Sequence, residues 1–215
     1  MCRTVAICSL ILMISCGFRG GKEAATAADV RAKFGFASDV VEICDASDVL
    51  GKRIGPVGRD SGNSRCGFDD AVLVYAVGGV ALTPPARMQC RTARIASTWM
   101  SEAVNPVFAD AGRDVTSMRV VADYSCRTRN HRRGAKLSEH AKGTAIDIAA
   151  FSTADGEVLT VLDDWRSRNG AFMKRLFRAS CRVWHTSIGP DGDRFHQDHM
   201  HFDATRDRGP GTWCR

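Results

Sequence analysis

Two short segments of the sequence concentrate histidine and carboxylate side chains. His140 and Asp147 lie seven positions apart, and His199 and His201 follow in a second segment. Imidazole nitrogens beside a carboxylate suit zinc, although these ligand types would also admit iron or manganese. A catalytic zinc takes three protein ligands and leaves a fourth position for water. The spacing therefore predicts one metal site that is built from both segments.

The first segment has the pattern of a buried strand that carries one acid. In a strand that begins just after Gly143, side chains alternate between two faces, so Asp147 lies between Ala145 and Ala149 on one face. A carboxylate on a strand that otherwise looks buried is costly unless a cation lies against it. A divalent metal shared with His140 would be such a cation.

The second segment has a strand pattern over residues 199–203. Its alternation places His199, His201 and Asp203 on one face, where the two imidazoles lie about 6.5–7 Å apart at Cα. Both can therefore address one small site, although a His-x-His pair also occurs by chance on surface strands. Asp203 is expected to form a salt bridge or to support a ligand rather than to bind the metal. We assign no role to the other histidines, His131, His185 and His196. His196 is expected to belong to the turn before the strand.

Length and composition limit the class of protein. The chain has 215 residues, of which 44% are hydrophobic, enough for one sizeable core. Its net charge of +6 favours anionic surroundings such as lipid head groups, nucleic acid or acidic wall polymers. The basic loop over residues 128–136 lacks interleaved aromatic side chains for stacking bases. We therefore expect no nucleic-acid partner.

The N-terminus is typical of an exported protein. Residues 1–16 combine a short positive start with an apolar run over residues 5–14 that is too short to span a bilayer. The run ends at Cys16 in a sequence that looks like a bacterial lipoprotein processing site, although ordinary signal cleavage nearby also fits. We expect a periplasmic or outer-envelope location, with a membrane tether if Cys16 is lipidated. Residues 17–37 are predicted to be a tether, and residues 38–215 the folded domain.

Cysteine usage agrees with export. Three of the nine cysteines lie in the signal, and six remain in the predicted domain. An even set without closely spaced pairs indicates three disulfides in an oxidising compartment rather than a zinc–thiolate cluster. Six cysteines allow many pairings, and we expect neighbours to join in order: Cys44 with Cys66, Cys90 with Cys126, and Cys181 with Cys214.

The rest of the chain mixes strand and helix patterns. Strands are predicted over residues 71–77, 80–82, 118–124, 158–162 and 186–188, and a helix over residues 171–184. Another helix is predicted to begin with Thr83 as N-cap and Pro84 in its first turn, and to end at Asn105-Pro106. Residues 39–67 look irregular. Because no regular βαβ rhythm is present, we expect an α+β domain: a small, mostly antiparallel sheet with flanking helices, stapled by disulfides.

One longer motif resembles a known group of enzymes. Ser138-x-His140-x-x-Gly143-x-Ala145-x-Asp147, followed by His199-x-His201, is similar to the superfamily of lysostaphin-type metallopeptidases, D-Ala-D-Ala peptidases and the hedgehog signalling domain. Further segments, such as Tyr124-Ser-Cys-Arg127 and His196-Gln-Asp-His-Met-His201, look like the bacterial extensin-like C-terminal domain family over about residues 44–214. The chain has only six prolines and does not resemble the proline-rich plant wall proteins.

The resemblance implies a fold like that of the hedgehog domain and the D-Ala-D-Ala peptidases, and a role for each motif residue. It implies that His140, Asp147 and His201 are zinc ligands. It also implies that His199 lies beside the metal and helps to activate water or to stabilise the oxyanion. Arg127 matches an arginine that neutralises developing negative charge, although it could equally be a surface arginine beside a disulfide. The chain lacks the Glu-x-x-His element of D-Ala-D-Ala dipeptidases, so the proton-transfer role falls to His199.

These inferences predict a zinc-dependent hydrolase of peptide bonds in the cell envelope. Its expected partner is peptidoglycan or a wall peptide, and its expected substrates are cross-links or stem peptides. The alternative is an inactive zinc-containing module that binds the wall or a partner protein. A fourth protein ligand that closed the metal site would favour that alternative. A non-haem iron oxygenase is a poorer fit to the motif spacing.

Overall fold

The structure, a computed structural model, describes residues 26–58, 62–205 and 211–215. The predicted export signal, including Cys16, lies outside the described residues. Within the described part of the chain, none of the helices is both long and apolar enough to cross a membrane.

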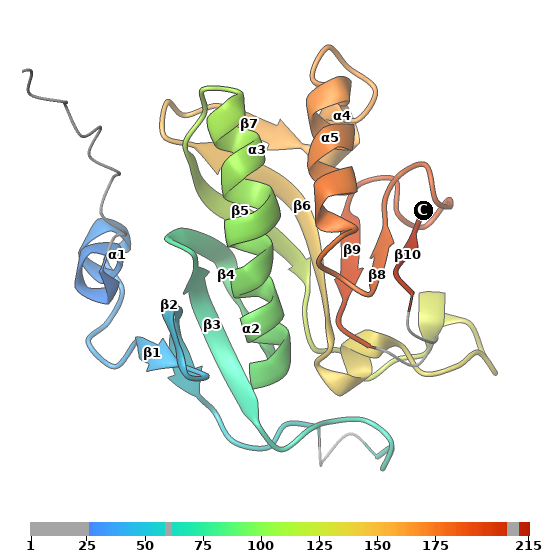
Figure 1. Cartoon of the computed structure of the whole chain (residues 1–215). Helices are drawn as coiled ribbons and strands as arrows, with labels where there is room; N and C mark the ends of the chain where they lie inside the picture. The colour runs from blue at the N-terminus through green and yellow to red at the C-terminus, as the bar shows by residue number, and fades with distance from the viewer. Residues whose placement is uncertain (1–25, 59–61, 206–210) are drawn as a thin grey trace, which may run out of the picture.

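One twisted sheet carries the functional segments (Figure 1). Its order is β1-β2-β3-β4-β5-β6-β9-β8-β10, and β7 also pairs with β6. The pairs are antiparallel except for β4–β5 and β8–β10, which are parallel. The predicted α+β class with a mostly antiparallel sheet is confirmed. The strands are β1 (Val41–Ile43), β2 (Ala46–Arg53), β3 (Ala71–Val77), β4 (Val80–Gln89), β5 (Val115–Ala122), β6 (Ala145–Thr153), β7 (Val158–Thr160), β8 (Thr186–Ile188), β9 (Met200–Asp203) and β10 (Trp213–Cys214).

Helices cover one face of this sheet (Figure 1). They are α2 (Cys90–Trp99), a π-helical turn (Met100–Val104), α3 (Asn105–Asp110), α4 (Val161–Asp164) and α5 (Gly170–Ser180). The main core lies between them and the strands, where the rings of Trp99 and Phe202 have centroids 4.8 Å apart. Ile146 and Ile148 of β6 belong to this core. By alternation, Asp147 faces away from the helices, as the strand pattern predicts.

The region predicted as a tether contains a helix. Residues 27–34 form α1 (Ala27–Phe34), which Thr26 caps through a reciprocal bond with Asp29 and which Gly35 ends in a left-handed conformation. Val30 of α1 is buried and packs with Leu50 of β2 in a second apolar cluster. Burial of Val30 explains why this segment is ordered. The neighbouring region 39–67, predicted to be irregular, contains β1 and β2.

The helix predicted to begin at Thr83 is wrong in both of its boundaries. Residues 83–89 continue β4, and α2 begins only at Cys90. Pro84 and Pro85 lie where the pairing of β4 with β3 shifts register, and a strand tolerates proline at such an irregularity because no ladder donor is needed. The helix also does not end at Asn105-Pro106. A π-helical turn leads into α3, in whose first turn Pro106 needs no N–H donor.

The other boundaries differ less. The predicted strand 118–124 is β5, which ends at Ala122, and residues 161 and 162 belong to α4 rather than to the strand before it. The helix predicted over residues 171–184 ends at Ser180.

Three disulfides join the described cysteines, but two pairs differ from the prediction. Cys181–Cys214 is confirmed. Cys44 instead joins Cys90, and Cys66 joins Cys126. Cys44 lies in the turn between β1 and β2, and Cys90 begins the helix that packs on β2 and β3. The pairing therefore follows the packing of distant segments rather than sequence order.

Candidate metal centre

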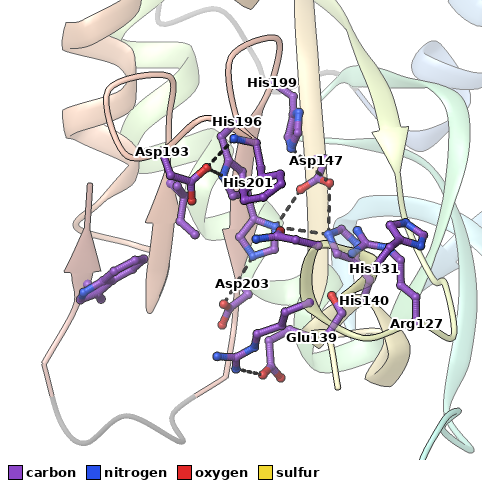
Figure 2. A pocket seen from close by; sticks show the side chains of 16 residues that line it. Arg127, His131, Glu139, His140, Asp147, Asp193, His196, His199, His201 and Asp203 are labelled. Atoms are coloured by element: carbon purple, nitrogen blue, oxygen red, sulfur yellow. Dashed lines mark hydrogen bonds and ion pairs between the residues drawn. The ribbon is translucent and has the colours of Figure 1, made fainter. Parts of the chain in front are cut away.

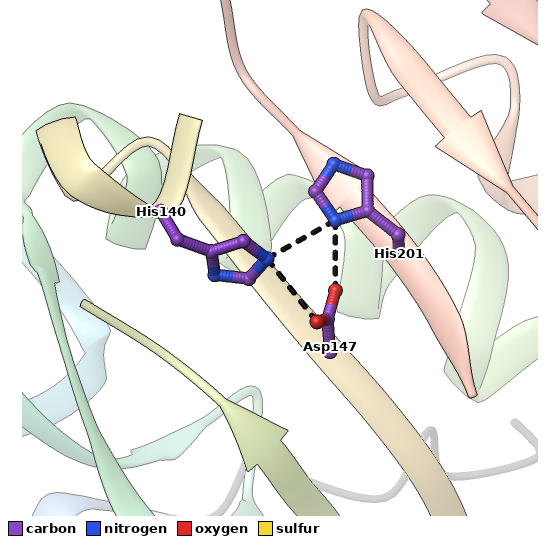
Figure 3. A group of neighbouring side chains, drawn as sticks. All are labelled: His140, Asp147 and His201. Carbon is purple, nitrogen blue, oxygen red and sulfur yellow. Dashed lines mark hydrogen bonds and ion pairs between the residues drawn. The ribbon is translucent and has the colours of Figure 1, made fainter. Parts of the chain in front are cut away.

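Three side chains from three elements converge on one another (Figure 3). His140 comes from the short 3-10 helix η3 (Glu139–Lys142), Asp147 from β6 and His201 from β9. Asp147 and His201 are direct partners in the β6–β9 ladder. One ligand atom from each of the three lies within 4.8 Å of the others, and all three residues are buried. The structure thus brings together the three residues that the motif implies as zinc ligands.

Gly143 turns the chain between His140 and Asp147. It ends η3 with a φ of +66°, a left-handed conformation that favours glycine. A Cβ atom at this position would lie 2.2 Å from the ring of Phe68. The glycine predicted at the turn is therefore required both by its backbone conformation and by a close contact.

A backbone bond fixes the ring of His140. Its Nδ1 lies 2.7 Å from the carbonyl oxygen of Asp123, which can only accept a hydrogen bond. Nδ1 therefore carries a proton, and in the neutral ring Nε2 presents a lone pair. That Nε2 lies 3.1 Å from Oδ2 of Asp147 and 3.2 Å from Nδ1 of His201. Because all three atoms can act as acceptors, a proton or a cation must lie among them.

Both nitrogens of His201 face carboxylates. Nδ1 lies 2.7 Å from Oδ1 of Asp147, and Nε2 lies 3.5 Å from Oδ2 of Asp203. Burial disfavours the charged ring, but the two carboxylates outweigh it and raise the pKa of His201 to about 9. Burial opposes ionisation of Asp147 as well, yet the His140 and His201 rings hold the pKa of that carboxyl well below its ordinary value. The metal-free centre is thus an ion pair.

This donor set fits a metal ion. Two imidazole nitrogens and a carboxylate oxygen are the ligands that zinc takes in many catalytic sites. His140 donates its other N–H to a backbone carbonyl, and His201 has a carboxylate at its other nitrogen, as metal-ligating histidines usually do. Asp203 contacts the nitrogen of His201 that points away from the triad, in the supporting position expected from the sequence.

His199 lies beside the triad and is not part of it. It directly precedes β9, and its Nε2 is 3.5 Å from Oδ2 of Asp147. Its Nδ1 is 2.9 Å from Oδ1 of Asp198. A carboxylate accepts a hydrogen bond, so Nδ1 carries the proton and Nε2 presents a lone pair toward the triad. The ring is partly exposed, with 17% of its side-chain surface open.

A pocket of about 520 Å³ opens over the triad (Figure 2). We call Arg127, Arg129 and His131, from the loop after β5, its basic wall. We call Ile188, Phe195 and Trp213 its apolar wall. Since β6 and β9 lie between β5 on one side and β8 and β10 on the other, the two walls flank the triad.

All five site residues predicted from the sequence line this pocket. Arg127 follows the Cys66–Cys126 disulfide, and its guanidinium has no ion-pair partner among the residues that the structure describes. His185 does not line the pocket, but two other histidines without an assigned role do: His131 and His196.

His196 is a residue that sequence reasoning missed. Its Nδ1 lies 2.7 Å from Asp193, and its ring lies 5.1 Å from that of His199, centroid to centroid. Burial lowers the pKa of His196, and the nearby His201 and His199 act in the same direction. Because His196 lies in a loop, no strand or helix period marks it. Its signal was the number of histidines within a few residues of His199.

One comparison with known proteins supports the family resemblance. The family described as "Extensin-like protein C-terminus" matches residues 43–215, which include all three triad residues and both walls of the pocket. No match was found among curated proteins or among solved structures. The chain belongs to the extensin-like protein C-terminus family.

Proposed function

We propose that this protein is a zinc-dependent hydrolase that cleaves peptide bonds of peptidoglycan, either in cross-links or in stem peptides, in the cell envelope. One observation carries the proposal. His140, Asp147 and His201 converge at the base of an open pocket, and a separate histidine, His199, points its free nitrogen at them.

The three converging residues would hold the zinc. When bound at such a site, zinc lowers the pKa of a water toward ~7 and polarises a carbonyl group. His199 is not a member of the group of three whose ligand atoms converge, and Asp203 lies at the nitrogen of His201 that points away from the triad. Three protein ligands would leave a fourth position for water. This arrangement favours a hydrolase over an inactive zinc-containing module.

His199 would transfer the proton between the attacking water and the leaving amine. Asp198 holds its Nδ1–H, so Nε2 is free to accept a proton from the attacking water and to return it to the leaving amine. Its ring is partly exposed and lines the pocket. No glutamate base is needed in this scheme.

Arg127 would stabilise negative charge. A guanidinium that lines the pocket and has no carboxylate partner in the described part of the chain is available to the oxyanion that forms during amide hydrolysis.

The sequence motifs support the substrate class and the location. The Ser-x-His-x-x-Gly-x-Ala-x-Asp and His-x-His patterns resemble lysostaphin-type enzymes and D-Ala-D-Ala peptidases, and the N-terminal residues resemble an export signal. We therefore propose a location outside the cytoplasm, beside peptidoglycan, with a membrane tether if Cys16 is lipidated. The proposal needs no nucleic-acid partner.

The test is incubation of the zinc-loaded protein with purified muropeptides, followed by mass spectrometry of the products. The wild-type protein should release products that the His140→Ala variant does not release. His185→Ala is the matched control, because that side chain does not line the pocket. Identical product patterns from wild type and His140→Ala would refute the proposal. Metal analysis of protein purified without a histidine tag identifies the bound ion.

A further inference from the structure

We propose that Arg129, held by the buried carboxylate of Glu139, forms a carboxylate-binding subsite beside the metal centre. The substrates would then be peptides that carry a free carboxylate close to the cleaved amide. This inference rests on the proposed peptidase function and narrows its substrate class.

Glu139 holds the guanidinium of Arg129 in place. Nη2 of Arg129 lies 2.8 Å from Oε1 of Glu139, whose side chain is only 5% exposed. A buried carboxylate is costly unless it is paired and hydrogen-bonded. The other oxygen of Glu139 accepts a bond of 3.0 Å from Oγ1 of Thr205 and lies 3.4 Å from Nζ of Lys142. Both carboxylate oxygens of Glu139 are therefore hydrogen-bonded or ion-paired.

The same network ties Arg129 to the segments that carry the triad. Glu139 directly precedes His140, and Thr205 follows the end of β9. The backbone oxygen of Glu139 also accepts bonds from Thr144, which directly precedes β6. Through Glu139, the Arg129 guanidinium is thus tied to the segments that carry the metal centre (Figure 2 labels Glu139 among the side chains that line the pocket).

The loop that carries Arg129 has an unusual backbone. Asn130 and His131 both have positive φ, at 53° and 55°, which is uncommon for residues other than glycine. Backbone bonds at 2.9 Å, from Arg129 N to Lys136 O and from Ser138 N to Arg127 O, close the loop on itself. Residues held in such conformations are typical of ligand clamps.

The charges on the basic wall leave a net positive surface. Arg129 has five N–H donors and uses Nη2 for Glu139, and Arg127 has no ion-pair partner in the described ranges. The other carboxylates that line the pocket do not belong to this wall but come from β6, β9 and the loop before β9: Asp147, Asp203 and Asp193. A guanidinium matches a carboxylate in shape and charge, so a peptide carboxylate fits this wall. An apolar side chain of the same peptide would face the apolar wall.

The carboxylate could be the C-terminus of the peptide or an acidic side chain. Three otherwise identical peptides distinguish these sources. The first has a free C-terminus next to the scissile bond, the second has the C-terminal amide, and the third has the amide and an acidic side chain at that position. Hydrolysis is measured with the zinc-loaded protein, and binding is measured calorimetrically with the metal-free protein.

Arg129→Ala should weaken both hydrolysis and binding of a carboxylate peptide by about 10- to 100-fold, as expected for loss of a charge-assisted hydrogen bond. Hydrolysis and binding of the amidated peptide without an acid should change less than about twofold in this variant. Glu139→Gln should give a smaller loss with the same selectivity, since the guanidinium would be less well held. Arg133→Ala is the matched control, because this exposed arginine of the same loop does not line the pocket.

Equal losses on all three peptides in Arg129→Ala would overturn the subsite, because they would indicate a structural role. No preference of the wild type for a carboxylate would overturn it as well. If none of the peptides is hydrolysed, the proposed function is refuted, but the subsite is not. Binding still decides the subsite in that case: selective loss in Arg129→Ala supports it, and unchanged binding refutes it.

Discussion

Nδ1 of His140 donates its proton to the backbone carbonyl oxygen of Asp123, 2.7 Å away, and this bond aims the other ring nitrogen at Asp147. Asp123 is itself held by Arg87 of β4, whose Nε and Nη2 lie 2.9 and 3.0 Å from its two carboxylate oxygens. The orientation of the candidate zinc ligand thus depends on the end of β5 and, through Arg87, on β4.

Asp203 supports His201 in the same way, through its side chain. Asp203→Asn keeps the shape but removes the charge that faces Nε2 of His201. We expect zinc affinity to fall about 10- to 100-fold, the usual cost of losing such a partner. Competition with a chelator measures this. Asp191→Asn, at an exposed acid that pairs with Lys174, should leave the affinity unchanged. Equal affinities of Asp203→Asn and wild type would show that His201 needs no such support.

His199 should matter for hydrolysis and not for metal binding. In His199→Ala, zinc content should stay within about twofold of wild type while kcat falls by about 10²- to 10⁴-fold, the range that a general acid–base contributes. The reason is that Nε2 of His199 points at the triad without belonging to it. Loss of zinc from this variant would instead identify His199 as a ligand.

The ion pair between His201 and Asp147 makes the stability of the metal-free protein depend on pH. The pKa of His201 is raised from 6.5 to about 9, so the protonated ring stabilises the folded state fully below pH 6.5, and this contribution is lost as pH rises through 9. The pKa of Asp147 is lowered from 3.8, so its contribution is present above pH 3.8 and is lost as pH falls further.

The Tm of EDTA-treated protein should therefore decrease from about pH 6.5 to about pH 9. His201→Gln should lack this decrease. Zinc binding should show the opposite trend, because the ion must displace the proton of His201, so the apparent affinity should rise by about tenfold per pH unit until about pH 9. A Tm that does not change over this range would mean that His201 is neutral in the metal-free protein.

Local periodicity explains what could be predicted about the candidate site. Alternation along β6 placed Asp147 opposite the isoleucines of the core, and the His-x-His spacing placed two rings on one side of the chain at β9. Those arguments need only neighbouring residues. The ladder that pairs Asp147 with His201 joins distant segments, and the sequence motif, rather than periodicity, indicated it.

The predictions that failed depended on distant contacts or on irregular backbone. Pro84 has the signature of a helix start, but pairing with β3 keeps its segment in β4. Pro106 has the signature of a helix end. It instead lies in the first turn of α3, after a π-helical turn, where the backbone N–H that proline lacks is not needed. The partner of Cys44 depends on where α2 packs, and Glu139 and His196 gain their contacts only from loops that fold onto the site.

The disulfides Cys44–Cys90 and Cys66–Cys126 allow a matched test of which one supports the geometry of the metal centre. They close loops of 46 and 60 residues, so removing either should cost a similar stability, about 2–4 kcal/mol. Cys126 lies between Asp123 and Arg127, on the segment that orients His140, whereas Cys44–Cys90 joins β1–β2 to α2. The Cys66→Ala/Cys126→Ala variant should therefore lose zinc affinity, and Cys44→Ala/Cys90→Ala should not. Thermal melts and chelator competition on both variants measure this, and equal zinc affinities would contradict it.

Alanine substitutions at Gly143 and Gly35 allow the effect of backbone strain to be distinguished from that of a local contact. Both have left-handed φ, +66° and +64°, so alanine at either position costs about 1–2 kcal/mol through its Cβ. At Gly35 nothing lies within 4 Å of that Cβ, whereas at Gly143 it would lie 2.2 Å from the Phe68 ring. Phe68 packs edge-on against Tyr124, with centroids 5.7 Å apart, so making room for the Cβ would disturb this ring pair. Gly143→Ala should therefore lower the Tm more than Gly35→Ala and should also weaken zinc binding, because η3 must shift and carry His140 with it. Equal losses of Tm with unchanged zinc affinity would mean that the turn adapts without moving the ligand.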